Sequence, residues 1–157
     1  MLDFSQMIFR LVLALILGAA IGFERELSGK EAGVRTSMMV SAGAAIFSVI
    51  ALTLPYLVAP SPEQIPEIIA RNGGFLAVIA NIVVGIGFLG AGIILKTEER
   101  VHGLTTAAVI WVTAGIGVLA GLGLAIFATT ATIFIAGLLY VLRKLGVTDR
   151  IRPEINR

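Results

Sequence analysis

The sequence predicts an all-α fold, a polytopic bundle of about five transmembrane helices with the N-terminus outside and the C-terminus in the cytoplasm. Hydrophobic residues make up 57% of the 157-residue chain and charged residues only 14%, against roughly 45–50% and about 25% in soluble domains. A soluble chain of this size could not bury so much apolar surface. The charges also fall into a few short segments, which divide the chain into long uncharged stretches.

The length of each uncharged stretch indicates how many helices it forms, because a helix needs about 20 apolar residues to cross about 30 Å of hydrocarbon. The stretch 11–23 is short, so we expect its helix to begin at Phe4 and Arg10 to extend its charge to the near interface. The 40 residues of 103–142 are enough for two helices, with a turn at Gly121-Leu122-Gly123. The predicted spans are 4–23, 36–59, 72–95, 104–120 and 124–142, which form a transmembrane domain, 1–142, before a basic cytoplasmic tail, 143–157.

The distribution of basic residues predicts the orientation of this bundle. Five spans place 10 of the 12 Lys and Arg residues on one side, in the first loop, the third loop and the C-terminal tail. Cytoplasmic loops of membrane proteins collect Lys and Arg. We therefore expect these two loops and the tail to lie in the cytoplasm.

Residues 85–92 form a glycine-rich block, G-I-G-F-L-G-A-G, whose first six letters match the G-x-G-x-x-G fingerprint of a dinucleotide-binding loop. The fingerprint needs a strand before it and an acidic residue about 20 positions after it, but the block lies in an uncharged span and Ile110 occupies that later position. In an apolar helix, glycines let two backbones approach closely. We therefore predict helix packing, within one chain or between protomers, at Gly18, Gly22, Gly85, Gly87, Gly90 and Gly92.

A weak internal repeat relates two predicted helical hairpins. The segments 17–21 and 33–36 are echoed by 89–93 and 103–106, and a charged loop on the same predicted side separates each pair. Repeats of the same orientation are related by an axis along the membrane normal, which would bring the two glycine-rich segments together near the centre. Chance similarity among small apolar residues is the alternative.

Polar residues indicate two candidate sites. Asn81 lies about a third of the way into its predicted span, where it is either an interhelical hydrogen-bonding group or a polar point in a ligand pathway or partner contact. At the cytoplasmic ends, the charged residues form either a solvated rim that meets anionic lipid head groups or a salt-bridge cluster that recognises a partner, with Arg35 reaching across. The candidates at these ends are Glu24, Arg25, Arg35, Thr105 and Thr106, next to the charged segment 96–100 and to His102, which we expect to be a surface residue rather than a metal ligand.

The residue chemistry argues against an enzyme and against a metal centre. The chain has no cysteine and one histidine, and it contains no recognisable catalytic triad, phosphate-binding loop or metal-hydrolase helix. A conduit for a hard cation is expected to offer oxygen ligands at membrane depth, but the predicted spans contain no Asp or Glu. We expect no enzymatic activity, no cofactor, no metal ligands and no nucleic-acid partner; the expected partners are the lipid bilayer and further copies of the chain.

Four motifs occur together over residues 11–125. They are the glycine block, Gly18-x-x-x-Gly22-x-Glu24-Arg25, the loop Ala32-Gly33-Val34-Arg35-Thr36, and Gly103-Leu104-Thr105-Thr106-Ala107-Ala108. In these motifs and their order the chain resembles the MgtC/SapB family of bacterial inner-membrane proteins. The resemblance implies about five membrane helices and a link to magnesium homeostasis, growth at low magnesium and, in pathogens, survival in macrophages. It also implies a membrane protein partner, since some members restrain the F-type ATP synthase.

The chain departs from the family pattern in two places. Many members carry a soluble ACT-like domain after the last helix, but here only 143–157 follow it, as in a member made of the membrane domain alone. Before the glycine block the family shows Asp-Pro-Thr-Arg-Ile-Ala-Ala-Gln, whereas 74–81 read Gly-Phe-Leu-Ala-Val-Ile-Ala-Asn. Gly74 and Ala77 replace the family's Asp and Arg, so a role built on those two residues does not transfer.

The sequence therefore predicts a non-enzymatic, multi-pass protein of the bacterial inner membrane that acts through protein contacts in magnesium homeostasis or stress adaptation. The alternative is a small oligomeric transporter of magnesium, protons or a metabolite. A third class is a purely structural subunit of an assembly.

Single cysteines can test the predicted orientation, because the chain is free of cysteine. Cysteines placed at Ser61 and Ser28 should react with a membrane-impermeant maleimide from outside and from inside, respectively, since the loop that contains Ser28 carries the positive charge. Labelling in the reverse pattern would overturn the orientation.

Overall fold

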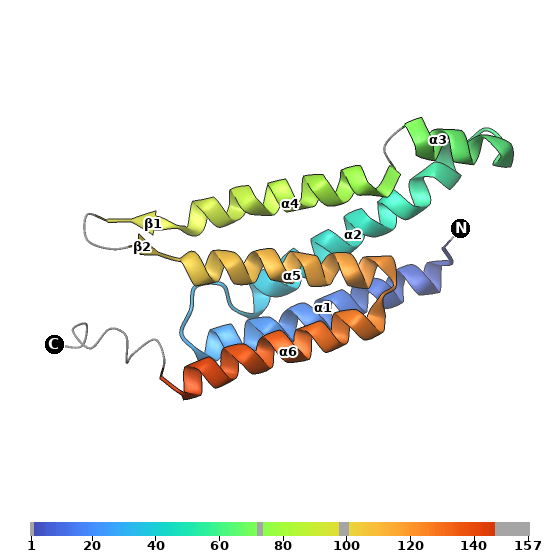
Figure 1. Cartoon of the computed structure of the whole chain (residues 1–157). Helices are drawn as coiled ribbons and strands as arrows, with labels where there is room; N and C mark the ends of the chain where they lie inside the picture. The colour runs from blue at the N-terminus through green and yellow to red at the C-terminus, as the bar shows by residue number, and fades with distance from the viewer. Residues whose placement is uncertain (1, 72–73, 98–100, 147–157) are drawn as a thin grey trace.

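Five long apolar helices lie side by side and form an elongated bundle in the computed structural model, which describes residues 2–71, 74–97 and 101–146 (Figure 1). Each of the five is long and apolar enough to cross a membrane. They are α1 (Phe4–Leu27), α2 (Val34–Val58), α4 (Gly74–Ile93), α5 (Leu104–Leu122) and α6 (Ala125–Lys144). The prediction of an all-α, polytopic membrane bundle is confirmed.

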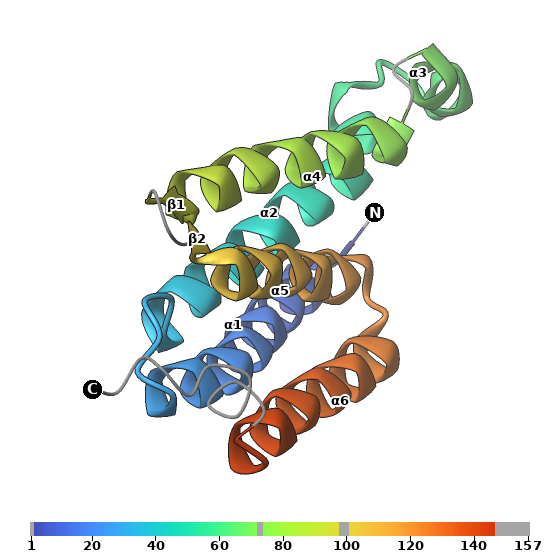
Figure 2. The same ribbon diagram turned by 60° about the vertical axis from the view of Figure 1, so that its left-hand side comes forward.

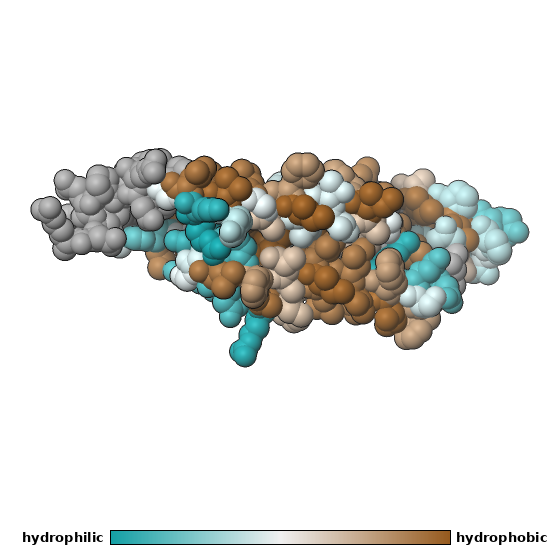
Figure 3. Space-filling model, turned by 90° about the horizontal axis from the view of Figure 1, so that it is seen from below, coloured by the Kyte–Doolittle hydropathy of each residue, from teal (hydrophilic) through white to brown (hydrophobic). Residues whose placement is uncertain are grey.

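Short elements connect the long helices at both ends of the bundle. A 3-10 turn, η1 (Pro62–Gln64), and the short helix α3 (Ile65–Arg71) lie between α2 and α4. A two-residue antiparallel ladder of β1 (Leu95–Lys96) and β2 (Val101–His102) connects α4 to α5. Gly123, with φ of 85°, makes the tight turn between α5 and α6, a left-handed conformation that favours glycine. A space-filling view shows an apolar middle, with hydrophilic surface gathered toward the two ends (Figure 3).

The second helices of the two hairpins, α2 and α5, lie at the centre of the bundle. α1 contacts both of them from one side and α4 contacts both from the other, while α6 packs on α1 and α5 (Figure 2). Three apolar clusters among the described residues follow from this arrangement, and the smallest joins α1, α2 and α5 through Ala14, Ala45 and Ala120. The other two lie on either side of it. One joins α1, α5 and α6 through Leu17, Ile21, Val109, Ile116 and Ala128, and the other joins α2, α4 and α5 through Ala44, Ile79, Ile82, Ala114 and Val118.

This arrangement corrects the expectation that the two glycine-rich segments meet near the centre. A Cβ added to Gly18 would lie 2.6 Å from the carbonyl oxygen of Ser37 on α2, and one added to Gly90 would lie 3.4 Å from the Cβ of Ala107 on α5. Each glycine segment thus packs on the second helix of its own hairpin, and these second helices separate the two segments. Aligning 33–36 with 103–106 makes Ser37 the counterpart of Ala107, so the two hairpins share this contact.

Glycines on α1 and α5 let the backbones of these two helices approach the backbone of α2 closely. A Cβ added to Gly22 on α1 would lie 2.6 Å from the Cα of Val34, and one added to Gly117 on α5 would collide with the carbonyl oxygen of Ser41. Lipid tails are as apolar as the helices, so close packing has to hold membrane helices together. The three-helix core of α1, α2 and α5 therefore requires glycine at these positions.

We expect Gly117→Ala to lower the free energy of unfolding by about 1–3 kcal/mol or more, as overpacking of a core does. The added methyl group meets the backbone of Ser41, which cannot swing aside as a flexible side chain would. Gly115→Ala is the matched control, because nothing lies within 4 Å of a Cβ at Gly115 on the same helix. Thermal unfolding of the purified variants in detergent measures both, and equal losses would contradict the close contact.

Candidate functional site

Arg25 and Thr106 connect two helices at the end of the bundle where α1 stops and α5 begins, here called the inner end. Nη2 of Arg25 donates a hydrogen bond to Oγ1 of Thr106 over 3.1 Å. Both side chains are only 4% exposed. A buried charge without polar partners is strongly destabilising, so this contact ties the C-terminal turn of α1 to the N-terminal turn of α5.

Glu24, the neighbour of Arg25, is connected to α6 through the hydroxyl of Ser28. Its Oε1 accepts a hydrogen bond from the Ser28 hydroxyl over 2.7 Å, and Nη1 of Arg143 on α6 lies 3.4 Å from the same hydroxyl. The Arg143 guanidinium also lies 5.3 Å from the centre of the Tyr140 ring. The second carboxylate oxygen of Glu24 and Nε of Arg25 are buried and have no hydrogen-bond partner among the described residues. Glu24 and Arg25 are therefore part of the bundle interior rather than of a solvated rim.

The structure separates the other predicted members of this cluster from Glu24 and Arg25. Arg35 is exposed, and so is Thr105 beside the buried Thr106. Arg35 makes no contact with Glu24 or Arg25 among the described residues, because the face of α2 that meets α1 carries Ser37 and Ser41. His102 is exposed on β2, and the acidic and basic residues 98–100 lie outside the described part of the chain. Since Ser28 is half-buried and hydrogen-bonded, the exposed Lys30 is the better inner position for cysteine labelling.

Glu26 fixes the loop between α1 and α2. Its Oε2 accepts a hydrogen bond from the backbone N–H of Val34, the first residue of α2, over 3.0 Å. The first N–H groups of a helix lack partners inside the helix, and the helix dipole favours a negative charge there. The carboxylate thus caps α2 and holds the two helices at the spacing that the glycine contacts require.

Arg10 makes the equivalent connection at the opposite, outer end of the bundle. Its Nη1 donates a hydrogen bond of 2.7 Å to the carbonyl oxygen of Gly121 at the end of α5, where terminal carbonyl groups lack partners inside the helix. The sequence predicted only that this charge reaches the interface. Fifteen residues separate Arg10 from Arg25 on α1, and fifteen separate Thr106 from Gly121 on α5. The equal spacing fits the antiparallel arrangement of α1 and α5, but no signal in the sequence identifies either partner.

Five hydroxyl groups in the described spans bond to a carbonyl oxygen of their own helix: those of Ser48, Thr53, Thr113, Thr130 and Thr132. Thr113 and Thr132 donate to the carbonyl oxygens four residues earlier, each over 2.8 Å, as threonine commonly does in a helix. Ser37 and Ser41 differ, since both are fully buried and their hydroxyls lack a partner within the described residues. They line the contact of α2 with α1, where their small size serves packing.

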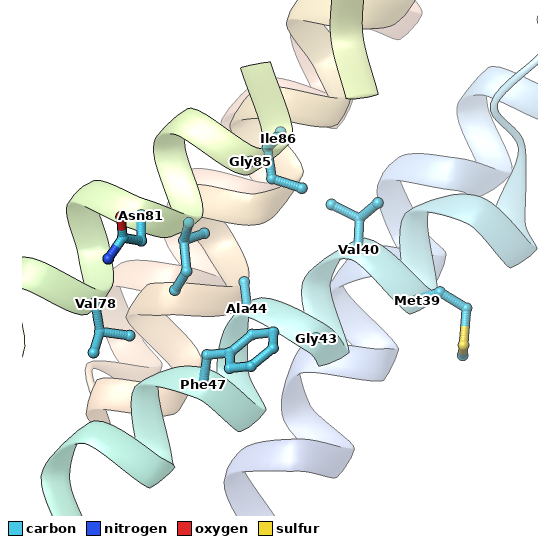
Figure 4. A pocket seen from close by; sticks show the side chains of 10 residues that line it. Met39, Val40, Gly43, Ala44, Phe47, Val78, Asn81, Gly85 and Ile86 are labelled. Atoms are coloured by element: carbon cyan, nitrogen blue, oxygen red, sulfur yellow. The ribbon is translucent and has the colours of Figure 1, made fainter. Parts of the chain in front are cut away.

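Asn81 lies in a groove between α2 and α4. The groove has a volume of about 520 Å³ and is walled by apolar residues and glycines, with the Asn81 amide as its polar group (Figure 4). The main wall residues are Met39, Gly43 and Phe47 on α2 and Val78, Asn81 and Gly85 on α4. The amide makes no hydrogen bond to any described residue. The sequence identified Asn81 but not the α2 wall, because no local pattern in 39–47 points to α4.

The six predicted packing glycines divide into two groups. Gly18, Gly22 and Gly90 face another helix of the same chain, whereas a Cβ added to Gly85, Gly87 or Gly92 would have no described atom within 4 Å. Packing inside a single chain therefore does not account for the second group. The other predicted role of these glycines is contact between protomers, and the exposed face of α4 is accessible for such a contact.

Within the described ranges, no group of three or more His, Cys, Asp or Glu residues is arranged to hold a metal ion. Arg25, which is buried, and Arg10, which is half-buried, donate hydrogen bonds from α1 to α5, while Glu24 accepts one from Ser28 at the end of its own helix. The fold and these sites define the class of the molecule: a polytopic membrane protein whose polar side chains hold the helices together.

The model of the MgtC family matches residues 11–147, and the chain belongs to this family. Among its relatives, Protein MgtC of Brucella abortus is 42% identical over 132 residues, which are 84% of this chain and 49% of that protein. Protein MgtC of Salmonella typhimurium is 44% identical over 128 residues, 82% of this chain and 48% of that protein. An uncharacterized protein of Haemophilus influenzae is 40% identical over 149 residues, 94% and 56% of the two chains. The chain thus spans about half the length of these curated relatives, and no solved structure matches it.

We expect Thr106→Val to lower the free energy of unfolding by about 1–3 kcal/mol, because it leaves a buried N–H of Arg25 without its acceptor. Thr105→Val is the matched control, since the neighbouring side chain is exposed, and it should change stability by less than about 0.5 kcal/mol. Denaturant titration in detergent with tryptophan fluorescence measures both. A destabilisation by Thr105→Val as large as that by Thr106→Val would contradict the assigned role of the hydrogen bond.

Proposed function

We propose that this protein is a non-enzymatic component of the bacterial inner membrane that supports adaptation to low magnesium and stress by contacting membrane proteins through its helices. Membership of the MgtC family supports the link to magnesium. By the same resemblance, the F-type ATP synthase is one candidate for such a partner. Contact rather than catalysis is favoured because Arg10 and Arg25 are engaged in hydrogen bonds that connect α1 to α5.

The observation that carries the proposal is the position of Asn81. Its amide lies in the apolar groove between α2 and α4, about a third of the way along α4 and without a hydrogen-bond partner among the described residues. Lipid tails cannot satisfy such a group, whereas a polar group on another helix can. The groove thus favours a protein helix over lipid as its occupant.

A second candidate function is a small oligomeric transporter of an ion or a metabolite. The same amide favours it, because polar groups at membrane depth often mark the path of a transported species. Magnesium is a demanding substrate for this site, since it prefers several oxygen ligands in octahedral geometry and the groove has one amide.

Growth and flux measurements separate the two functions. In a host that lacks its own member of the family, the protein should restore growth in low-magnesium medium, Asn81→Leu should abolish this effect, and Asn81→Gln should retain it because it keeps the amide. In proteoliposomes that contain a magnesium-sensitive or pH-sensitive dye, the wild-type protein should not raise flux above that of empty vesicles. Saturable flux that Asn81→Leu removes would instead establish transport.

A further inference from the structure

The contacts among the helices have an internal symmetry. Among the described residues, exchanging α1 with α4, α2 with α5 and α3 with α6 maps each well-packed pair of these six helices onto a well-packed pair, and the α2–α5 pair onto itself. The exchange follows the sequence repeat, in which α1 and α2 form the first hairpin and α4 and α5 the second. It also matches the equivalent contacts of Gly18 with Ser37 and of Gly90 with Ala107.

The two halves are not identical, because α4 packs less closely on α5 and α2 than α1 packs on α2 and α5. They also differ in the length of the third helix of each repeat. α6 has 20 residues and packs along α1 and α5, where Ala128, Ala131, Ile135 and Leu139 join their apolar cluster. Its counterpart α3 also contacts α2 and α4 but has only seven residues. The place that α6 fills beside α1 and α5 is therefore largely unfilled beside α4 and α2, and the groove of about 520 Å³ lies there.

We propose that α4 of a second copy of this chain fills the groove, so that two copies pair around a twofold axis along the membrane normal. A twofold axis in this direction gives both copies the same orientation in the membrane and makes the contact self-complementary. The occupant then runs in the same direction as the α4 of the first copy, as α6 runs in the same direction as α1 (Figure 1). The inference rests on the proposed function in one respect: it names a second copy of the chain as the protein that occupies the groove between α2 and α4.

Asn81 favours a second copy over another occupant. An amide carries both a hydrogen-bond donor and an acceptor, so two Asn81 side chains related by a twofold axis can each donate to the other. Such a bond between membrane helices contributes about 1–2 kcal/mol in model peptides. The pairing thus satisfies the amide that a single chain leaves without a partner.

Two of the three α4 glycines that have no neighbour in one chain lie on the same face as Asn81. Gly85 and Gly92 are four and eleven residues after Asn81, spacings that place all three on one side of a helix, and nothing described lies within 4 Å of a Cβ at either glycine. Close approach of two backbones at small residues is the usual geometry of paired membrane helices. α4 is also the span with the smallest buried share, 6%, in a single chain. The pairing thus covers the helix that the single chain buries least.

Single cysteines test the pairing in membranes of cells that produce the protein. With Val78→Cys, which places the thiol in the groove wall, oxidation with copper phenanthroline should produce a disulfide-linked dimer. Ala80→Cys is the control, because this exposed position two residues away does not line the groove, and it should remain monomeric. Equal crosslinking at the two positions would overturn the proposal. The absence of crosslinking at both positions, together with a monomeric mass of the wild-type protein in light scattering, would also overturn it.

Glycine variants add a second, steric test. Gly85→Leu should abolish the Val78→Cys dimer while Gly87→Leu leaves it intact, since both positions accept a side chain within one chain but only Gly85 lines the groove. Asn81→Leu should weaken the dimer by about 5- to 30-fold and Asn81→Gln much less. Equal effects of the two leucine variants would contradict the assigned face.

The same samples distinguish failure of the pairing from failure of the proposed function. A Val78→Cys crosslink to a different protein would refute the second copy as occupant, while the growth phenotype could still hold. A dimer that behaves as expected in cells whose growth is unaffected by Asn81→Leu would support the pairing and refute its role in adaptation to low magnesium.

Discussion

The bundle depends on the close approach of α1 and α5 to the backbone of α2. Gly22 and Gly117 place these two helices against Val34 and Ser41, where a single methyl group would not fit. Dispersion falls off steeply with distance, and in lipid no hydrophobic force compensates for a gap between helices. The positions of α4 and α6 follow, because both pack on surfaces that the three central helices create.

The helices differ in how firmly the chain holds them. Sixty-one per cent of the apolar window of α5 is buried, against 11% for α6 and 6% for α4. α5 also receives hydrogen bonds from α1 at both ends. α4 has none of these anchors among the described residues and contributes mainly apolar contacts through Ile79, Ile82 and Ile86. The surface available for association is therefore concentrated on the helix with the fewest internal constraints.

Features that depend on local sequence were predictable, and those that depend on distant partners were not. The five spans follow from the lengths of uncharged stretches, and the family from four short motifs. The partner of Arg25 lies 81 residues away and that of Arg10 lies 111 residues away, so neither contact has a local pattern. Arg35 was assigned to the cluster because it is close in sequence to Glu24 and Arg25, but the rotation of α2 directs its serines, not Arg35, toward α1. Asn81 was identified as polar, but the groove beside it exists only because α2 and α4 pack together.

The two arginine hydrogen bonds hold α1 and α5 in a defined register. Sliding one helix past the other by a single residue would move it about 1.5 Å, which is enough to break both hydrogen bonds at once, since their length varies by only a few tenths of an ångström. Rotation of α1 about its axis would withdraw both arginines together. The two contacts together therefore oppose a piston-like shift of α1 against α5. α4 has no such hydrogen bond among the described residues, so nothing comparable opposes a change in its tilt.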